Sequence, residues 1–202
     1  MDVIDSGRED DNRLLQQMIA GEESGFVSLY QKYQAPVYRF SLQIGGSRDV
    51  AEEVTQETFL ALIRRPQKYQ AERGPLLLYL FGIARNLAWK SARTERCFGA
   101  LDDDTEVPEA KSEDMANELA RRQQVMRVRL AVLSLPPKYR EVIVLCALQE
   151  LSYEQAATVV GSSIGTVRSR MHRAKQLLLR KLKKDELVAE APREGSVLRY
   201  EL

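Results

Sequence analysis

Two helical patterns lie close together in residues 151–182, which read LSYEQAATVVGSSIGTVRSRMHRAKQLLLRKL. The first spans Ser152 to Val160, the second begins at Ile164, and only a glycine and two serines separate them. Ser152 and Gln155 have the spacing of a capping box, in which two side chains satisfy free amide groups at a helix start. A short helix, a tight turn containing glycine and a second helix are the parts of a helix-turn-helix unit. We therefore predict this unit here.

The second helix of this unit has the charge that a nucleic-acid contact requires. At about 100° per residue one face collects the apolar stripe, which consists of Val167, Met171, Ala174 and Leu178. No acid occurs between Glu154 and Asp185, so the helix can approach a polyanion without repulsion. Side chains near the start of such a helix reach base edges, while its cations pair with phosphates. The candidate DNA-contacting residues are Thr166, Arg168, Ser169, Arg170, His172, Arg173 and Lys175.

A solvated basic helix face is the simpler explanation of a charge run, but the spacing of the turn favours DNA recognition. His172 is the only histidine of the chain, and no nucleophile or paired carboxylate stands near it in the sequence. We interpret it as a groove-facing polar residue rather than as a catalytic one.

Charge is strongly segregated along the 202 residues, although the net charge is only +1. Eight basic and two acidic residues lie from Arg64 to Arg96, and eight acidic residues with one lysine lie from Asp102 to Glu118. From Ile164 to Lys184 there are eight basic residues and no acid. Two basic blocks that suit nucleic acid therefore flank an acidic one.

Several other classes of protein are not indicated. Cys97 and Cys146 stand far apart with no cysteine or histidine at metal-ligand spacing, so we expect reduced thiols and no metal site. The apolar runs are too short to cross a bilayer and the acidic N-terminus lacks the features of a signal peptide, so we expect a cytoplasmic protein without direct membrane insertion. The chain has no nucleotide-binding glycine motif and no triad, so we expect no enzyme, no cofactor and no small-molecule substrate.

The periodicity is helical wherever it is clear, which predicts an all-α fold. We expect helices over 12–19, 24–45, 49–64, 75–93, 116–133, 137–148, 152–160 and 164–184. The acidic stretch with Gly99 and Pro108 has no apolar period, so it is predicted to be a flexible linker. The predicted parts are an N-terminal extension with a short helix (1–23), a helical domain (24–95), the linker (96–115), a second helical domain (116–184) and a C-terminal tail (185–202).

Two segments of the first domain have distinctive compositions. In residues 49–62 the expected buried stripe is Ala51, Val54, Thr58, Phe59 and Leu62. The opposite face carries Glu53, Gln56, Glu57 and Leu60, and an exposed leucine beside acids points to a protein-binding surface. In residues 76–93 the rings of Tyr79, Phe81 and Trp89 alternate with Arg85, Lys90 and Arg93. This mixture suits single-stranded nucleic acid, although a place in the core explains each ring at least as well.

Three runs of the sequence together resemble one family. They are DVAEEVTQETFLAL (49–62), YLFGIARNLAWKSAR (79–93) and LPPKYREVIVLCALQELSYEQAATVVGSSIGTVRSRMHRAKQLLLRKL (135–182). In this order and spacing they resemble a bacterial sigma factor of the sigma-70 family, of the extracytoplasmic-function (ECF) type. The resemblance covers about 24–95 and 131–182, and it implies two helical domains, region 2 and region 4, with no domain between them.

The resemblance also implies partners and site residues. The helix over 49–62 would dock on the clamp helices of the β′ subunit of core RNA polymerase through Glu53, Gln56, Glu57 and Leu60, and the β subunit is a further expected contact. The segment 64–96 would open and hold the −10 element of promoter DNA, with Asn86, Lys90, Arg93 and Arg96 as contact candidates. The helix from Ile164 would recognise the −35 element. A sigma factor is a specificity subunit and not an enzyme, and an anti-sigma factor is an expected partner.

Two features keep alternatives open. In the family the connector between the domains follows the RNA path of the polymerase, so the acidic linker would mimic a transcript there, or it would be a solvated spacer. A stand-alone helix-turn-helix regulator that dimerises on a palindrome is the main functional alternative. It explains residues 152–184 but leaves the segment 76–93 and the acidic-faced helix without a role, and it would shift duplex DNA by itself.

Overall fold

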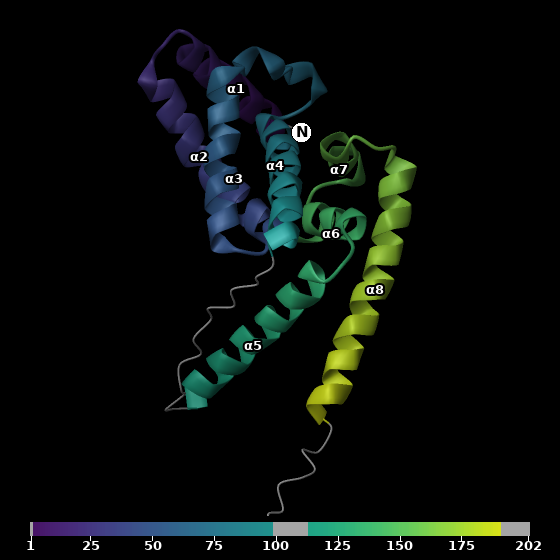
Figure 1. The fold of residues 1–202 in the computed structure, drawn as a ribbon. Helices are drawn as coiled ribbons and strands as arrows, with labels where there is room; N and C mark the ends of the chain where they lie inside the picture. The colour runs from purple at the N-terminus through teal and green to yellow at the C-terminus, as the bar shows by residue number, and fades with distance from the viewer. Residues whose placement is uncertain (1, 99–112, 191–202) are drawn as a thin grey trace, which may run out of the picture.

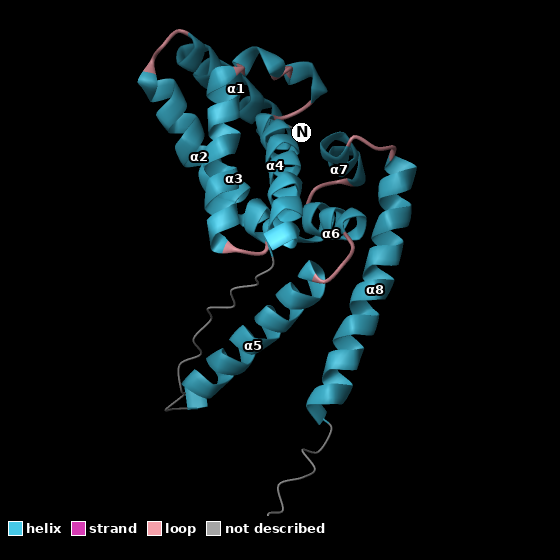
Figure 2. Ribbon diagram, viewed as in Figure 1, coloured by secondary structure: helices cyan, strands magenta, loops and turns pink. Residues whose placement is uncertain are grey.

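Helices form all the regular structure of residues 2–98 and 113–190, the part of the chain that this computed structural model describes; side chains are described for 9–91 and 121–183. The first half contains α1 (Asp2–Ile19), α2 (Glu23–Gly45), α3 (Arg48–Arg64), the 3-10 turns η1 (Pro66–Lys68) and η2 (Ala71–Arg73), and α4 (Leu76–Phe98). The second half contains α5 (Glu113–Leu133), α6 (Pro137–Ile143), the π-helical segment η3 (Val144–Leu148), α7 (Tyr153–Val160) and α8 (Ile164–Glu190). Figure 2 shows no strand among the described residues, so the all-α prediction is confirmed for them.

The predicted helices have observed counterparts that differ mainly at their ends. α1 begins at Asp2 rather than Asn12, and α8 continues to Glu190 rather than ending at Lys184. α4 and α5 also extend into the predicted linker, whose central residues 99–112 lie outside the described part. These added turns lie outside the stretches of clear apolar periodicity from which the helices were predicted.

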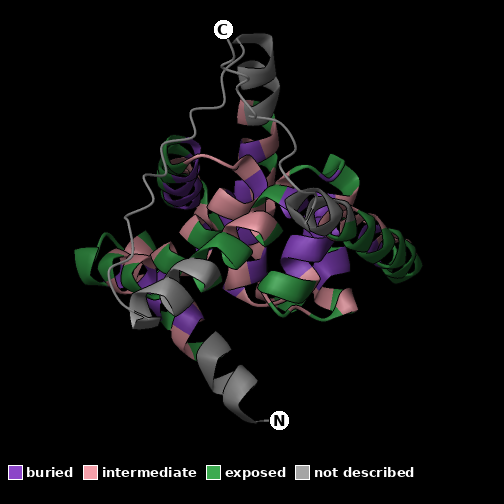
Figure 3. Cartoon of the chain, turned by 90° about the horizontal axis from the view of Figure 1, so that it is seen from below, coloured by how far each residue is buried: buried purple, intermediate pink, exposed green. Residues whose placement is uncertain are grey.

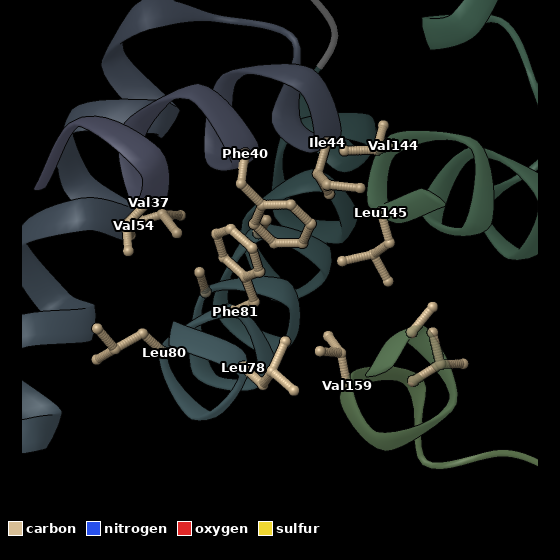
Figure 4. Close-up of a cluster of buried hydrophobic side chains, with 14 of the residues drawn as sticks. Val37, Phe40, Ile44, Val54, Leu78, Leu80, Phe81, Val144, Leu145 and Val159 are labelled. Carbon is tan, nitrogen blue, oxygen red and sulfur yellow. The ribbon is translucent and has the colours of Figure 1, made fainter. Parts of the chain in front are cut away.

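α1, α2, α3 and α4 pack side by side as the N-terminal bundle (Figure 1). Phe40 of α2 and Phe81 of α4 lie at its centre with their ring centroids 4.7 Å apart, and both side chains are buried (Figure 4). The stripe of α3 expected to be buried, Ala51, Val54, Thr58, Phe59 and Leu62, is buried in the structure. Burial of these apolar side chains removes water from large surfaces and stabilises the bundle.

A glycine permits α1 and α2 to pack closely. A Cβ atom added to Gly25 would lie 2.6 Å from the carbonyl oxygen of Leu14 and 2.7 Å from the amide nitrogen of Met18. The same helix pair contains a buried carboxylate, Asp11, which accepts hydrogen bonds from Tyr33 and, at 2.6 Å, from Lys32. Two donors on one carboxylate satisfy a charge that would otherwise be costly to bury.

α6, η3, α7 and α8 form the C-terminal unit, which contains the predicted helix-turn-helix. Ser152 begins α7: its hydroxyl accepts a hydrogen bond from the Gln155 amide at 3.2 Å, and the Gln155 side chain accepts one from the Ser152 amide at 2.9 Å. This is the predicted capping box, now confirmed. Gly161 ends α7 with φ +69°, a left-handed conformation that glycine adopts without a steric penalty, so the chain turns sharply into α8.

The buried core is continuous between the N-terminal bundle and the C-terminal unit. Figure 4 shows Ile44 of α2 beside Val144 of η3, and Leu78 of α4 directed toward Val159 of α7. Buried segments occupy the middle of the molecule in the end-on view of Figure 3. α5 and α8 diverge from this centre (Figure 1). The two halves of the chain therefore share one core.

Candidate nucleic-acid and protein interfaces

The first turn of α8 is fixed by its own side chains. Ser163 accepts a hydrogen bond from the Thr166 amide at 3.2 Å, and the hydroxyl of Thr166 lies 2.9 Å from that of Ser163. These contacts satisfy free groups at the helix start, as an N-cap residue does. Val167 and Met171 anchor the opposite side of the helix, because both are buried against the rest of the C-terminal unit. The helix is thus held rigidly with one face outward.

The outward face of α8 contains most of the predicted DNA-contacting side chains. Arg168, Ser169, His172, Arg173 and Lys175 are exposed. Gln176 lies beside His172, with the two side-chain nitrogens 2.9 Å apart. Arg173 also lies against α6, where its hydrogen bond to Tyr139 lowers the pKa of that hydroxyl. A cationic, exposed first half of a recognition helix is the geometry that major-groove binding requires.

Arg170 differs from the other candidates on α8. Its Nη1 atom lies 3.1 Å from Oε1 of Glu141, and this carboxylate side chain is only 4% exposed. The guanidinium is half-buried against α6 instead of extending into solvent with its neighbours. A contact between Arg170 and a DNA phosphate remains a prediction. The guanidinium would have to leave Glu141 to make that contact.

The predicted protein-binding face of α3 forms one surface. Glu53, Gln56 and Leu60 are exposed, and Glu57 is half-buried with its carboxylate 3.9 Å from Arg64. Ile63, which the sequence analysis did not select, is 44% exposed beside this face, compared with 37% for Leu60. Two exposed apolar side chains among acids are a stronger signal of a protein contact than one. The position of Ile63, three residues after Leu60 on the helix, would have revealed it.

The predicted −10 candidates lie along α4. Asn86 and Lys90 are exposed, while the side chains of Arg93 and Arg96 lie outside the described ones. Asn86 accepts a hydrogen bond at 3.2 Å from Arg85. Exposure leaves the amide and ammonium groups of α4 accessible to a polyanion.

The aromatic rings of α4 belong largely to the packing of the molecule. Phe81 is 1% exposed and stacks on Phe40, so of the two alternatives left open for this ring the place in the core is the one observed. Trp89 is half-buried beneath the guanidinium of Arg140, which lies 5.4 Å from the ring centre. Tyr79 is partly exposed, and burial raises the pKa of its hydroxyl. Tyr79 also borders an open cavity.

This cavity has a volume of about 440 Å³ and lies between α4 and α7. The segment from η1 through α4 contributes cations and polar groups to its lining, which are Lys68, Gln70, Arg73, Tyr79, Arg85 and Asn86. The C-terminal unit contributes the stretch Thr158–Gly161. No acid is among the described residues that line it, so the cavity suits an anionic or polar guest such as a nucleotide.

Charged residues between the two halves of the chain were missed by sequence reasoning. Arg85 of α4 contacts Glu141 of α6 at 2.8 Å, and Arg140 donates to the carbonyl oxygen of Ile44 in α2 at 2.8 Å. Both α6 residues are buried. The sequence did contain one signal, because the charged residues Arg140 and Glu141 directly precede the apolar run of residues 142–145. Charges next to a buried run are expected to be buried themselves, and buried charges require partners.

None of the described helices is long and apolar enough to span a bilayer. No cluster of three or more metal-ligating side chains is present within the same part of the chain.

Comparison with known proteins decides the family. Residues 29–97 match the family model "Sigma-70 region 2", and residues 125–178 match "Sigma-70, region 4". The ECF RNA polymerase sigma factor SigL of Mycobacterium tuberculosis is 31% identical over 169 residues, which cover 81% of this chain and 93% of SigL. This chain belongs to the ECF RNA polymerase sigma factors.

Other ECF sigma factors are similar over much of the chain. SigE of Mycolicibacterium smegmatis is 35% identical over 74% of this chain and 58% of SigE, and BldN of Streptomyces coelicolor is 32% identical over 85% of this chain and 66% of BldN. The chain therefore spans less than two thirds of the length of these two relatives.

Solved structures of sigma factors have a similar fold. CnrH, in a complex with the cytosolic domain of CnrY, has a TM-score of 0.67 and 26% identity over 87% of this chain and 99% of CnrH. RpoE of Bartonella quintana, in a complex with the anti-sigma factor NepR, has a TM-score of 0.62 and 24% identity over 79% of this chain and 98% of RpoE, a likeness of fold alone. In this ECF sigma factor the region 2 match lies largely on the N-terminal bundle, and the region 4 match includes α7 and the first part of α8.

Proposed function

We propose that this chain is a specificity subunit of bacterial RNA polymerase that directs initiation to promoters with its own −10 and −35 elements. α3 would bind the clamp helices of the β′ subunit through Glu53, Gln56, Glu57 and Leu60. α8 would recognise the −35 element in the major groove, and the segment from η1 through α4 would hold the opened −10 strand.

The observation that carries the proposal is the pairing of two exposed surfaces on one chain. The acidic face of α3 bears Leu60 and Ile63, whereas the first half of α8 is cationic and exposed. The two helices lie apart in Figure 1, so a protein partner and a DNA partner could be bound together. A stand-alone regulator would need only the second surface.

No catalytic group is needed for this function. Strand opening would be driven by binding energy in the polymerase complex, where an unstacked base is captured in a pocket. The chain would act in the cytoplasm, where the polymerase and the chromosome are. An anti-sigma factor is a proposed partner, because the resemblance to ECF sigma factors implies one.

Run-off transcription tests the proposal directly. Core RNA polymerase with and without this chain would transcribe a library of genomic fragments, and the new 5′ ends would be sequenced. We expect new start sites that share two spaced upstream motifs. Start sites that do not depend on the chain, together with a shift of duplex DNA by the chain alone, would support the stand-alone regulator instead.

The promoter-contact assignment on α8 has its own test. Arg168→Ala should reduce transcription through the −35 element while core binding stays intact, because the side chain is exposed and outside the core. Arg13→Ala is the matched control, since Arg13 is an exposed arginine on α1. Unchanged transcription by Arg168→Ala would remove Arg168 from the contact set.

The polymerase contact on α3 is tested separately. The double variant Glu53→Ala/Leu60→Ala should weaken co-elution with core polymerase, because it removes a charge and an apolar group from the proposed face. Glu22→Ala, an exposed glutamate in the turn before α2, is the control. Normal co-elution of the double variant would contradict this assignment.

A further inference from the structure

Glu141 on α6 and Arg170 on α8 form an ion pair on the side of α8 away from its exposed cations. We propose that this pair positions α8, so that it determines how sharply the chain discriminates between −35 sequences although neither side chain contacts DNA. This role rests on the proposed function, because it concerns how α8 recognises the −35 element. Arg170 then has a different role from the phosphate contact that the sequence predicted.

The ion pair is largely removed from solvent. Nη1 of Arg170 lies 3.1 Å from Oε1 of Glu141, and the two side chains are 27% and 4% exposed. Oε2 of Glu141 is held separately by Nε of Arg85 on α4, at 2.8 Å. Each carboxylate oxygen therefore has its own guanidinium, and charge-assisted hydrogen bonds of this kind are short and directional. The carboxylate thus has a defined position from which it holds Arg170.

α6 provides a fixed base for the pair. Val142 and Ile143, the two residues after Glu141, are buried. Arg140, the residue before it, donates to the carbonyl oxygen of Ile44 in α2 at 2.8 Å. Because α6 is anchored on both sides of Glu141 in a close-packed interior, a contact with this carboxylate fixes α8 relative to a rigid element.

The apolar anchors of α8 do not fix its rotation by themselves. Val167, Met171 and Ala174 are buried, but the burial of apolar surface is non-directional. Methionine also adapts its shape to its surroundings, since it has three rotatable bonds. A helix held only by such contacts can turn by several degrees while its apolar face stays covered. The ion pair supplies the directional contact that these residues lack.

Arg170 lies opposite two of the proposed DNA-contacting residues. At about 100° per residue, Arg168 and His172 each lie about 160° around the helix axis from Arg170. The pair therefore holds the inward side of α8, while Arg168 and His172 are exposed on the outward side. A rotation of α8 by about 10° would move groups about 6 Å from its axis by about 1 Å. Hydrogen bonds to base edges tolerate a range of only about 0.5 Å, so loss of the pair should impair base recognition.

A second explanation of the same contact is that Glu141 withholds a phosphate-binding arginine from DNA. The two explanations predict opposite effects of Glu141→Gln, which releases Arg170. A withheld arginine would then reach a phosphate, so affinity would rise and the slope of log affinity against log salt would steepen by about 0.9. A lost positioning contact would instead reduce discrimination between sequences. The inward direction of Arg170, toward α6, favours positioning.

The test selects DNA duplexes from a random library with the full-length chain, alone and assembled with core polymerase. The wild-type chain should enrich a −35 motif, and discrimination is the ratio of the Kd for its single-base variants to the Kd for the motif. Arg170→Met should reduce this ratio by about fivefold or more, the discrimination that one well-made base contact carries. Its salt slope on a non-specific duplex should equal that of the wild type. Arg170→Met leaves Glu141 paired with Arg85, so no buried charge loses all its partners.

A double-mutant cycle shows whether the two residues act as one unit. Glu141→Gln should reduce discrimination as Arg170→Met does, and Glu141→Gln/Arg170→Met should reduce it no further. Arg13→Met, at an exposed arginine on α1, is the matched control and should leave discrimination unchanged. Tm is measured for every variant, because a purely structural role would lower Tm while the folded chain kept its discrimination.

Unchanged discrimination in Arg170→Met would overturn the inference. A salt slope shallower by about 0.9 in this variant would also overturn it, because Arg170 would then be bound to a phosphate. Tighter binding by Glu141→Gln with undiminished discrimination would show that Glu141 withholds Arg170 instead. If Glu141→Gln does not fold by circular dichroism, Arg170→Met alone decides.

Two results for the wild-type chain separate this inference from the proposed function. A chain that enriches no motif, alone or with polymerase, would overturn the inference, because there would be no base recognition for the pair to sharpen. Absence of chain-dependent start sites in run-off transcription would refute the proposed function, and it would leave the selection by the chain alone readable.

Discussion

Because α1 packs closely on α2, we expect alanine to have opposite effects on stability at two helical glycines, Gly25 and Gly82. Gly25→Ala should destabilise the protein, because its Cβ atom would lie 2.6 Å from the Leu14 oxygen and 2.7 Å from the Met18 nitrogen. Both are backbone atoms, so the new methyl group cannot be accommodated by rotating a side chain. α1 would have to move by roughly 0.5–1 Å, which loses a quarter to a half of the dispersion energy of each contact that opens.

The expected magnitude follows from two opposing effects. Overpacking of this kind costs about 1–3 kcal/mol, and the helix propensity of alanine over glycine returns about 0.5–1 kcal/mol. The net loss of about 1–2 kcal/mol corresponds to a decrease in Tm of roughly 2–8 °C for a chain of this size. Differential scanning calorimetry would measure it, and hydrogen exchange should become faster in α1.

Gly82→Ala is the matched control in α4. A Cβ atom there would meet no other atom within 4 Å, so only the propensity gain applies. We expect Tm to rise by roughly 1–4 °C. If Gly25→Ala melted at or above the wild-type temperature, or if both substitutions shifted Tm in the same direction, the close-contact argument for α1 and α2 would be refuted.

Three further predictions concern other parts of the molecule. Ser152→Ala should lower the stability of the helix-turn-helix by about 1 kcal/mol because it removes an N-cap, and Ser152→Asp should restore most of it, as urea unfolding would measure. Phe81→Ala should cost about 3–5 kcal/mol through a cavity in the core, whereas Tyr79→Phe should cost much less because Tyr79 is partly exposed; similar costs would contradict the placement of Phe81. Burial raises the pKa of the Cys146 thiol above that of a free cysteine, so in a Cys97→Ser background alkylation should be slow at neutral pH and accelerate only at a higher pH than for a free thiol. The same raised pKa means that this contribution to stability is fully present below the pKa of the unfolded thiol and is lost as the pH rises toward the folded-state pKa, whereas alkylation with the pH midpoint of a free thiol would contradict the burial.

Local features could be predicted because they depend on neighbouring residues. Ser152, Gln155 and Gly161 determine where α7 begins and ends, since a cap needs only side chains and amide groups within one turn. The buried stripe of α3 followed from helical spacing, because one face of an amphipathic helix must turn away from water. The outward cations of α8 followed from the same reasoning, and only Arg170 lies differently.

The sequence alone determined the helical fold, the helix-turn-helix and the family, all of which depend on patterns within one segment or on the order of segments. The tertiary structure decided that Phe81 is in the core, that Ile63 extends the face of α3, and that Glu141 joins Arg85 to Arg170. These outcomes depend on which helices meet in space, and a hydrophobic period gives the buried face of a helix but not its neighbour. A buried charge can be suspected from its position before an apolar run, but its partner, 56 residues away in the case of Glu141 and Arg85, is defined only when the chain has folded.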